Sequence, residues 1–537
     1  MTIPDYRASI SLLQKLPNEL FNDILDRLAN RDRKSLRLTC RYLGSQVPLR
    51  LDRVFISANP LNVKVFLAVA SHEVFRRQVK EIIWDDVTLL VPPPHDYDYD
   101  NIECGYTSDE NEIHKNWMTY QSKGKIPGWF VRYCKKELKN VKSRLVDKGR
   151  DNEQQRRLDN LMPTREAFPY YNHLVQQQDN VIDSGADEQA FIYALQESRF
   201  PHLEKVTVTP AAHGVLFFPL YETPMIRAFP YGFVYPILRG WSYAGDDGSL
   251  PLTAERWDDK EEKRKWRGFR IVSRLFADPK LPHNISQLSF DNHKLATGIN
   301  CLVFDQPNME YDNLCRALKR PGLKSFTLSL RIRYLSDWDA EDWDFFRKRK
   351  LRSLIAGAHS LEEMTLQTDY PVESTCWSAP VSDSISLFDI FPIEQWSTEG
   401  NLKHFGLSGI QVTQDDLISL LGKLPPTLQS IELSFLSVIE GTGHYAGILA
   451  DIRDKLDWRH RHIDKRIRIC VLVTIDQPDY GRYTCLDKEV NEYIYGDGPP
   501  PFGVDGSGSG FRMVEFGTGM QYDEFDPDFA QSYSKRT

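Results

Sequence analysis

A short pattern of apolar positions recurs along the middle of the chain. In each copy, an apolar residue is followed by two others, a second apolar residue, one other and a third apolar residue. Six copies read LEKVTV, ISQLSF, LKSFTL, LEEMTL, LKHFGL and LQSIEL. Alternating apolar positions are typical of strands with one buried face, so we expect strands at residues 206–208, 288–290, 326–328, 364–366, 405–407 and 431–433. A fainter seventh copy, IRICVL, places its apolar positions at Ile467, Cys470 and Leu472.

A segment with helical spacing of apolar residues precedes nearly every copy, such as YDNLCRALKR before residue 323 and QDDLISLLGKL before residue 428. Strands that alternate with helices predict an α/β fold with a parallel sheet. One strand–helix unit cannot bury its apolar face alone, which favours stacked units in an irregular leucine-rich-repeat-like α/β solenoid with parallel strands. The alternative is a doubly wound α/β domain whose strands resemble one another by coincidence.

One further unit is predicted ahead of these copies. Val54 to Ile56 reads as a strand, Asn59 and Pro60 open a helix, and Ile82 to Trp84 reads as a second strand. A strand, a helix and a strand in this order form a βαβ unit. Its length is close to the leucine-rich-repeat period of roughly 20–29 residues.

Two short helices are predicted near the N-terminus, within LPNELFNDILDRLANRDRKSLRLTCRYL at residues 16–43. Pro17 suits the first turn of a helix, where a missing N–H costs nothing. Apolar residues fall at helical spacing at Leu20, Phe21, Ile24, Leu25 and Leu28, and then at Leu36, Cys40 and Leu43. A module of about 40 residues cannot build a sufficient core alone. The stripe therefore packs on the rest of the chain, as in an ordinary helical hairpin, or on another protein.

The order and spacing of these residues resemble the F-box motif in register and without a gap. The matching positions are Leu16-Pro17, Glu19-Leu20, Ile24-Leu25, Leu28, Asp32, Leu36-Arg37, Cys40-Arg41 and Leu43. Arg33 stands where a leucine is usual, and Leu43 where tryptophan is frequent. The resemblance implies a three-helix module that binds a Skp-type adaptor, and through it a cullin–RING ubiquitin ligase. It places Leu16 and Pro17 on the adaptor side. The segment after the module also resembles the one that follows the F-box in many fungal F-box proteins.

Nine residues are the expected adaptor-binding set: Leu16, Pro17, Leu20, Ile24, Leu25, Leu28, Leu36, Cys40 and Leu43. Some of them should pack inside the module and others should bind the adaptor. Substrate contacts are expected on the strand side of the solenoid, which is its concave surface. The candidates are the outward neighbours of the apolar positions, Glu362, Thr365, Lys403, His404, Glu432 and Ser434.

Three regions follow from this organisation: an F-box at 1–50, a leucine-rich-repeat-like substrate-binding domain at 51–495, and a flexible linker with an acidic and aromatic tail at 496–537. Insertions are expected near 92–160 and 210–258. In the first, residues 92–114 read as a loop, and the Lys- and Arg-rich stretch after Arg132 as a solvated helix. The aromatic residues of the second form either core or a binding surface. The tail is either disordered or folds back on the repeats.

Composition narrows the function further. The formal net charge of -8 lacks the basic footprint of a nucleic-acid-binding protein. Eight cysteines without CxxC spacing argue against a zinc site or a disulfide framework and favour the cytosol or the nucleus. No stretch is long and apolar enough for a membrane helix, and no cofactor is expected. GSGSG at 506–510 has the letters of a nucleophile elbow but reads as a linker.

The resemblance thus implies a non-catalytic substrate-recognition subunit of an SCF-type (Skp–cullin–F-box) ubiquitin ligase, which presents an unknown protein substrate. An adaptor-bound scaffolding protein without a ligase role is the alternative. An enzyme of an unrecognised class is a third hypothesis, for which the sequence gives no adequate signal.

Overall fold

The computed structural model describes residues 16–89, 126–145, 152–237, 254–335, 340–369, 385–474, 481–503 and 514–532, apart from residues 29, 197, 198, 255, 259, 282, 296, 515 and 516. The expected loop at 92–114, Trp241 and most of the expected linker lie outside these residues.

The main sheet is parallel, and its strands lie side by side in chain order. Its strands are β1 (Arg53–Ile56), β2 (Glu81–Asp85), β3 (Lys205–Thr209), β4 (Gln287–Phe290), β6 (Ser325–Arg331), β9 (Glu363–Thr368), β10 (His404–Ser408), β12 (Ser430–Ser434) and β14 (Arg468–Cys470), with β5 (Ile299–Asn300) beside the end of β6. The six strands predicted from the recurring pattern all belong to it. The chain is therefore an α/β protein with one large parallel sheet, as predicted.

The register explains the recurring pattern. Val206, Leu288, Phe326, Met364, Phe405 and Ile431 pair in a continuous row across the sheet. Val208, Phe290, Leu328, Leu366, Leu407 and Leu433 form a second row. Both rows are buried in one hydrophobic core. Alternate residues of a strand point to opposite faces, so the pattern marks the face that the helices cover.

The seventh copy was predicted one residue out of register. Ile469, and not Cys470, pairs with Ile431 and is fully buried. Cys470 pairs with Glu432 on the opposite face. Leu472 has left the main sheet and pairs with Cys485 in a separate antiparallel one. Ile467, Ile469 and Val471 are all fully buried and alternate along the chain, so the step of three from Ile467 to Cys470 reaches the opposite face.

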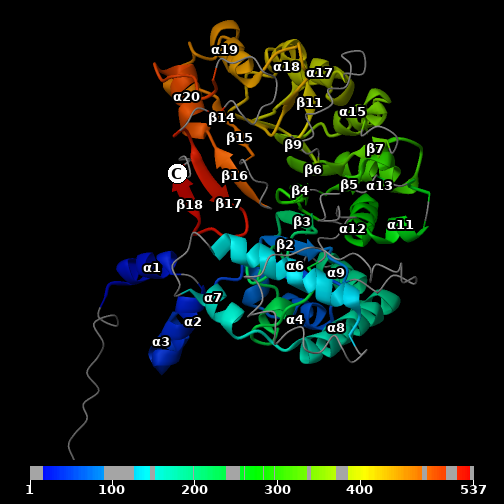
Figure 1. Cartoon of the computed structure of the whole chain (residues 1–537), viewed down its shortest axis with the longest axis vertical. Helices are drawn as coiled ribbons and strands as arrows, with labels where there is room; N and C mark the ends of the chain where they lie inside the picture. Colours follow the sequence, from blue (N-terminus) through cyan, green and yellow to red (C-terminus); the bar gives the residue numbers. More distant parts are fainter. Residues whose placement is uncertain are drawn as a thin grey trace, which may run out of the picture.

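Helices connect consecutive strands and pack on that one face, outside the arc that the strands follow in Figure 1. They are α4 (Pro60–Ala70), α9 (Ala186–Leu195), α11 (Lys260–Arg264), α12 (Arg267–Ala277), α13 (Met309–Leu318), α14 (Asp344–Arg347), α15 (Lys350–Ala356), α16 (Leu387–Ile390), α17 (Ile393–Glu399), α18 (Gln414–Leu421), α19 (Tyr445–Lys455) and α20 (Asp487–Tyr495). Short 3₁₀ turns lie at Phe75–Arg77, Cys301–Phe304 and Ile463–Lys465. Asn59 caps α4 by accepting from the N–H groups of Leu61 and Asn62, with Pro60 in the first turn, as predicted.

The two insertions build a second hydrophobic core. Their helices are α6 (Gly128–Leu145), α7 (Glu153–Asp159), α8 (Thr164–Ser184) and α10 (Pro224–Arg227). Phe130, Cys134 and Leu138 of α6 are buried together with Phe233 and Tyr235 of the second insertion. The prediction of a solvated helix after Arg132 was wrong, because apolar residues at a spacing of three to four lie between its lysines. Phe233 and Tyr235 are core, whereas Tyr231 is exposed.

The C-terminal segment folds back. β15 (Leu472–Val473), β16 (Arg482–Cys485), β17 (Met520–Asp523) and β18 (Ala530–Ser532) form an antiparallel sheet, on the inner side of the arc in Figure 1. Phe525 enters the second core. Of the two alternatives for the tail, residues 520–532 therefore follow the second. Two small sheets, β7 (Arg333–Leu335) with β8 (Ala340–Asp342) and β11 (Gln411–Val412) with β13 (Ser437–Val438), complete the described strands.

Candidate protein-interaction surfaces

The N-terminal residues form a helical module with a small core of its own. It consists of α1 (Asn18–Arg27), α2 (Asn30–Thr39) and α3 (Arg41–Gln46), which lie to one side of the body in Figure 1. Phe21, Leu25, Leu43 and Val47 are buried together, and Leu16, Leu28 and Leu36 pack against them. This cluster is separate from the main core. The module therefore packs around its own hydrophobic core and not around that of the main sheet.

Arg33, at a position where the F-box resemblance leads one to expect a leucine, is buried in this module with 1% of its surface exposed. Its guanidinium donates to the carbonyl oxygens of Leu28 (3.1 Å) and Pro48 (3.0 Å), and to that of Leu25. Leu25 and Leu28 lie at the end of α1, where the carbonyl oxygen of Leu25 also accepts from the N–H of Leu28 at 3.0 Å. Asp26 lies 3.5 Å from the same guanidinium. Arg33 thus ties the end of α1 to the segment that follows α3.

Helix α1 has more apolar surface than the module covers. Phe21 and Leu25 form its buried strip, and Leu20 and Ile24, also four residues apart, form a parallel strip that is 55% and 37% exposed. Pro17 is exposed at the start of the same helix. The module also exposes Leu38 (88%) and Tyr42 (45%).

The nine expected adaptor-binding residues therefore divide into three groups. Pro17, Leu20, Ile24 and Cys40 are exposed, Leu16, Leu28 and Leu36 are partly buried, and Leu25 and Leu43 are buried. Leu25 and Leu43 are core residues of the module and are not available to a partner. The helical spacing of apolar residues could not separate the exposed residues of α1 from the buried ones, because both strips of this helix have that spacing.

The face of the main sheet opposite the helices is polar. Thr207, Ser289, Thr327, Thr365, Gly406 and Glu432 pair across it in register; we call it the polar face. Thr365 and Glu432 were expected on this face. A Cβ at Gly406 would lie 2.9 Å from the side chain of Thr365, so this face is crowded even where its residues are small.

Glu362, Lys403 and His404 lie where the strands begin. The carboxylate of Glu362 accepts from Lys403 (2.7 Å) and pairs with Lys324 (3.1 Å). Hydrogen bonds from Lys403 and Lys324 lower the pKa of Glu362. The ring of His404 contacts the hydroxyl of Ser430 (2.8 Å), and burial lowers its pKa. All three are partly exposed and within reach of a partner.

Ser434 was a wrong choice. Its side chain is fully buried, and its hydroxyl accepts from the N–H of Leu472 at 3.2 Å. The residue lies at the end of β12, where β15 begins to cover the sheet. Ser434 lies on the same face of its strand as Glu432, and this alternation suggested an exposed side chain. The C-terminal sheet that covers it was not predicted.

A cluster of charged residues bridges the polar face, formed by Tyr221, Asp291, His293, Lys294, Glu432 and Glu524; we call it the bridge cluster. His293 Nδ1 lies 3.0 Å from Glu524 Oε1, and the hydroxyl of Tyr221 lies 3.3 Å from His293 Nε2. Lys294 Nζ lies 3.9 Å from Glu432. The loop after β4, the second insertion and the C-terminal segment therefore meet over the polar face of the main sheet.

Interactions between charged groups outweigh burial in setting the pKa values of His293 and Glu524 in the bridge cluster. Burial lowers the pKa of His293, but the carboxylates of Asp291 and Glu524 outweigh it and raise that pKa above its ordinary value. Burial likewise raises the pKa of Glu524, and His293 and Lys294 lower it further than burial raises it. The sequence search missed the cluster. Its one local signal is the polar run DNHK after β4, in which His293 and Lys294 adopt positive φ and the side chain of Asp291 accepts from the N–H of His293.

A buried ion triad fastens the C-terminal segment at a second point. Asp523 on β17 pairs with Arg482 on β16 (3.0 Å) and with Arg144 on α6. All three side chains are less than 5% exposed. The segment thereby joins the last strands to the first insertion.

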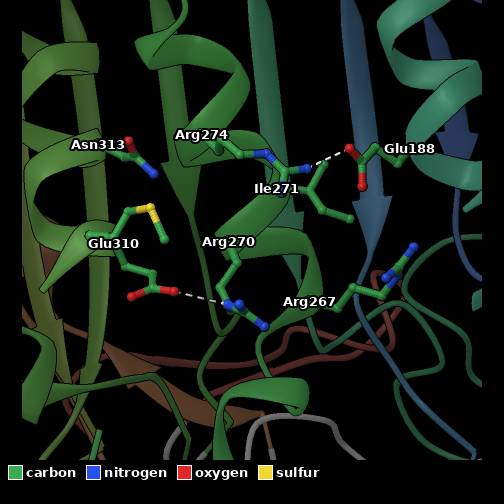
Figure 2. A pocket seen from close by; sticks show the side chains of 8 residues that line it. Glu188, Arg267, Arg270, Ile271, Arg274, Glu310 and Asn313 are labelled. Atoms are coloured by element: carbon green, nitrogen blue, oxygen red, sulfur yellow. Dashed lines mark hydrogen bonds and ion pairs between the residues drawn. The ribbon is translucent and has the colours of Figure 1, made fainter. Parts of the chain in front are cut away.

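A small cavity lies on the other side of the main sheet, among α9, α12 and α13. Its volume is about 120 Å³, and its lining is Glu188, Arg267, Arg270, Ile271, Arg274, Met309, Glu310 and Asn313. Figure 2 shows the guanidinium groups of Arg267, Arg270 and Arg274 around Ile271, with Arg270 paired to Glu310 and Arg274 to Glu188.

Other kinds of site are not found among the described residues. No group of three or more His, Cys, Asp or Glu residues there is arranged to hold a metal ion. None of the described helices combines the length and apolar composition needed to cross a bilayer. A scan against protein-family models gave no match, and a search of curated proteins gave none either.

Proposed function

We propose that this chain is an F-box protein, the substrate-recognition subunit of an SCF-type ubiquitin ligase. In this proposal α1–α3 bind a Skp-type adaptor, and the rest of the chain is a leucine-rich-repeat-like scaffold that holds a protein substrate. The scaffold part is supported by parallel strands in chain order whose connecting helices, apart from those of the two insertions, pack on one face.

The exposed strip of α1 carries the adaptor proposal. Leu20 and Ile24 are large apolar side chains that the module leaves uncovered. They lie where the F-box resemblance expects an adaptor, beside Pro17. An apolar strip on a small separate unit marks a site of protein association.

A double substitution tests the proposal, with binding of a purified Skp-type adaptor as the measurement. Leu20→Ala with Ile24→Ala removes the exposed strip without touching Phe21 or Leu25. Full burial of such a side chain contributes roughly 1.5–3 kcal/mol. Because alanine keeps a methyl group and both side chains are already partly covered in the module, the pair should cost less than twice that, about 2–4 kcal/mol, or roughly thirty- to a thousandfold in affinity. Leu16 is a poorer choice because it packs against the module core.

Helix α4 offers a matched control. Leu61 and Val65 are also four residues apart and both 37% exposed, but they lie on the main body. Leu61→Ala with Val65→Ala should leave adaptor binding unchanged. Equal loss in both double variants, or no adaptor binding by the unaltered protein, would remove the F-box proposal.

The alternative, an adaptor-bound scaffold without a ligase role, shares the same adaptor surface. Recovery of a cullin together with the adaptor supports the ligase, and recovery of the adaptor alone supports the scaffold. Substrate contact is proposed at Glu362, Lys403 and His404, where the strands begin, and at Thr365 and Glu432 on the polar face; all five side chains are partly exposed.

A further inference from the structure

Three arginines on one side of α12 line the cavity shown in Figure 2. Arg267, Arg270 and Arg274 are three and four residues apart, so their side chains leave the helix on the same side. They come from an eleven-residue helix whose other side is buried in the main core.

A carboxylate on a neighbouring helix anchors each arginine. Asp187 of α9 accepts two hydrogen bonds from Arg267, at 3.0 and 2.7 Å. Glu310 of α13 accepts from Arg270 at 3.0 Å, and Glu188 of α9 accepts from Arg274. A guanidinium carries five N–H groups, so each of these arginines, all of which line the cavity, has N–H groups beyond those that bind its carboxylate.

The anchoring carboxylates are themselves largely satisfied. Glu310 also accepts from the indole N–H of Trp257 (3.1 Å) and lies 3.7 Å from Lys263. Asp187 is fully buried behind Arg267. The three arginines therefore line the cavity together with two carboxylates, Glu188 and Glu310.

One amide adds to the donors. The side-chain oxygen of Asn313 accepts from Arg316 at 2.8 Å, so its NH₂ group is left for the cavity. Ile271 and Met309 supply an apolar wall. The lining is thus rich in fixed donors and poor in free acceptors.

We propose that this cavity binds a phosphate-class oxyanion, either the free ion or a phosphomonoester group of a larger ligand. Arginine forks held by carboxylates present donors in a fixed geometry, which suits a multidentate oxyanion. Ion pairs also join other neighbouring helices, as Arg349 joins Asp389, but here three arginines of one helix line the same cavity. The proposal is independent of adaptor binding.

Calorimetric titration of the full chain with inorganic phosphate and with phosphoserine tests it, at ionic strength matched with sodium chloride. Both ligands should bind saturably. Arg274→Gln should weaken binding about tenfold or more, the effect of losing one charge-assisted hydrogen bond. Arg270→Gln should act in the same direction. Tighter binding of phosphoserine assigns the cavity to a larger phosphorylated ligand, and tighter binding of phosphate assigns it to the free ion.

Arg349→Gln is the matched control, since Arg349 is 63% exposed and Arg274 is 52% exposed, each paired with one carboxylate. It should not change phosphate binding. If Arg270→Gln fails to fold, Arg274→Gln still decides, because its side chain is half exposed. Absence of saturable binding, or equal binding by Arg274→Gln and the unaltered protein, overturns the proposal and leaves the arginines as ties between helices.

Discussion

The ammonium group of Lys294 lies 3.9 Å from the carboxylate of Glu432, although β4 and β12 are separated in the sheet by β6, β9 and β10. Four steps between flat neighbouring strands would span roughly 19 Å, at about 4.8 Å each. The sheet must therefore curve strongly, with the polar face inside. Gln367 on β9 likewise reaches Asp291 after β4 at 3.0 Å, past the intervening β6.

Asp523→Asn should destabilise the protein by about 3–5 kcal/mol, the usual cost of breaking a buried ion pair from one side. The change takes a shared negative charge from two guanidinium groups that are almost fully buried, Arg144 and Arg482. Denaturant unfolding of the full chain measures the loss. The control is Asp464→Asn, whose carboxylate is 83% exposed beside His462 and which should change stability by less than about 0.5 kcal/mol. A tolerated Asp523→Asn would show that the triad contributes little.

The attachment of the C-terminal segment should weaken as pH rises. The folded-state pKa of His293 is raised by Asp291 and Glu524 against the opposing effects of burial and Lys294. A raised folded pKa means that the stabilisation is complete below the ordinary histidine value of about 6.5 and is lost as pH rises through the folded value. The other groups that face His293 are Tyr221, Glu524 and Asp291.

NMR titration of the His293 ring checks this directly. Its pKa should lie above the ordinary value and should fall in Glu524→Gln, which removes the carboxylate at 3.0 Å. Stability of His293→Gln should vary less with pH across the same window. A His293 pKa that does not move in Glu524→Gln would contradict the ion pair.

Arg33→Ala should destabilise the N-terminal module by about 2–4 kcal/mol, since hydrogen bonds from a charged donor contribute about 1.5–3 kcal/mol each and do not add fully. The carbonyl groups of Leu25, Leu28 and Pro48 lose the guanidinium as a donor, and among the described residues only that of Leu25 keeps a backbone donor, the N–H of Leu28. Hydrogen exchange should speed up in α1–α3 and stay unchanged in the main sheet, because the module has its own core. Arg27→Ala is the control, since its side chain is 79% exposed and pairs only with a surface carboxylate, Asp23. Arg33→Leu asks whether an apolar side chain can replace the arginine.

Gly406→Ala should cost roughly 1–3 kcal/mol, as overpacking does, because the added methyl would lie 2.9 Å from the Thr365 side chain on the curved polar face. Gly422→Ala, where the nearest atoms lie at 3.4 Å, should be tolerated. Thermal unfolding of both variants gives the comparison. Equal melting temperatures would argue that the sheet can flatten at β10.

The sequence was sufficient for the sheet because strand faces repeat with a period of two. Val206, Leu288 and Phe326 stand in equivalent places of the recurring pattern, and they pair as neighbours in the sheet. The pattern failed at Cys470, which lies on the opposite face, because its neighbour Ile469 takes the buried place.

The surfaces were harder to predict because they depend on contacts between distant residues. Spacing places Leu20 and Leu25 in one stripe of α1, but only the packing of α3 through Leu43 decides which is covered. Glu524 carries no local sign that it meets His293, which precedes it by more than two hundred residues. Ser434 was misplaced for the same reason, since the strand that covers it comes from the C-terminal sheet.

The ion triad links the order of synthesis to the completion of the fold. Arg144 leaves the ribosome long before Asp523 and Phe525 do. The second core therefore cannot be completed until these two residues have been synthesised, and contacts of such long range form slowly. Until then the nascent chain keeps an incompletely packed surface within reach of chaperones and proteases.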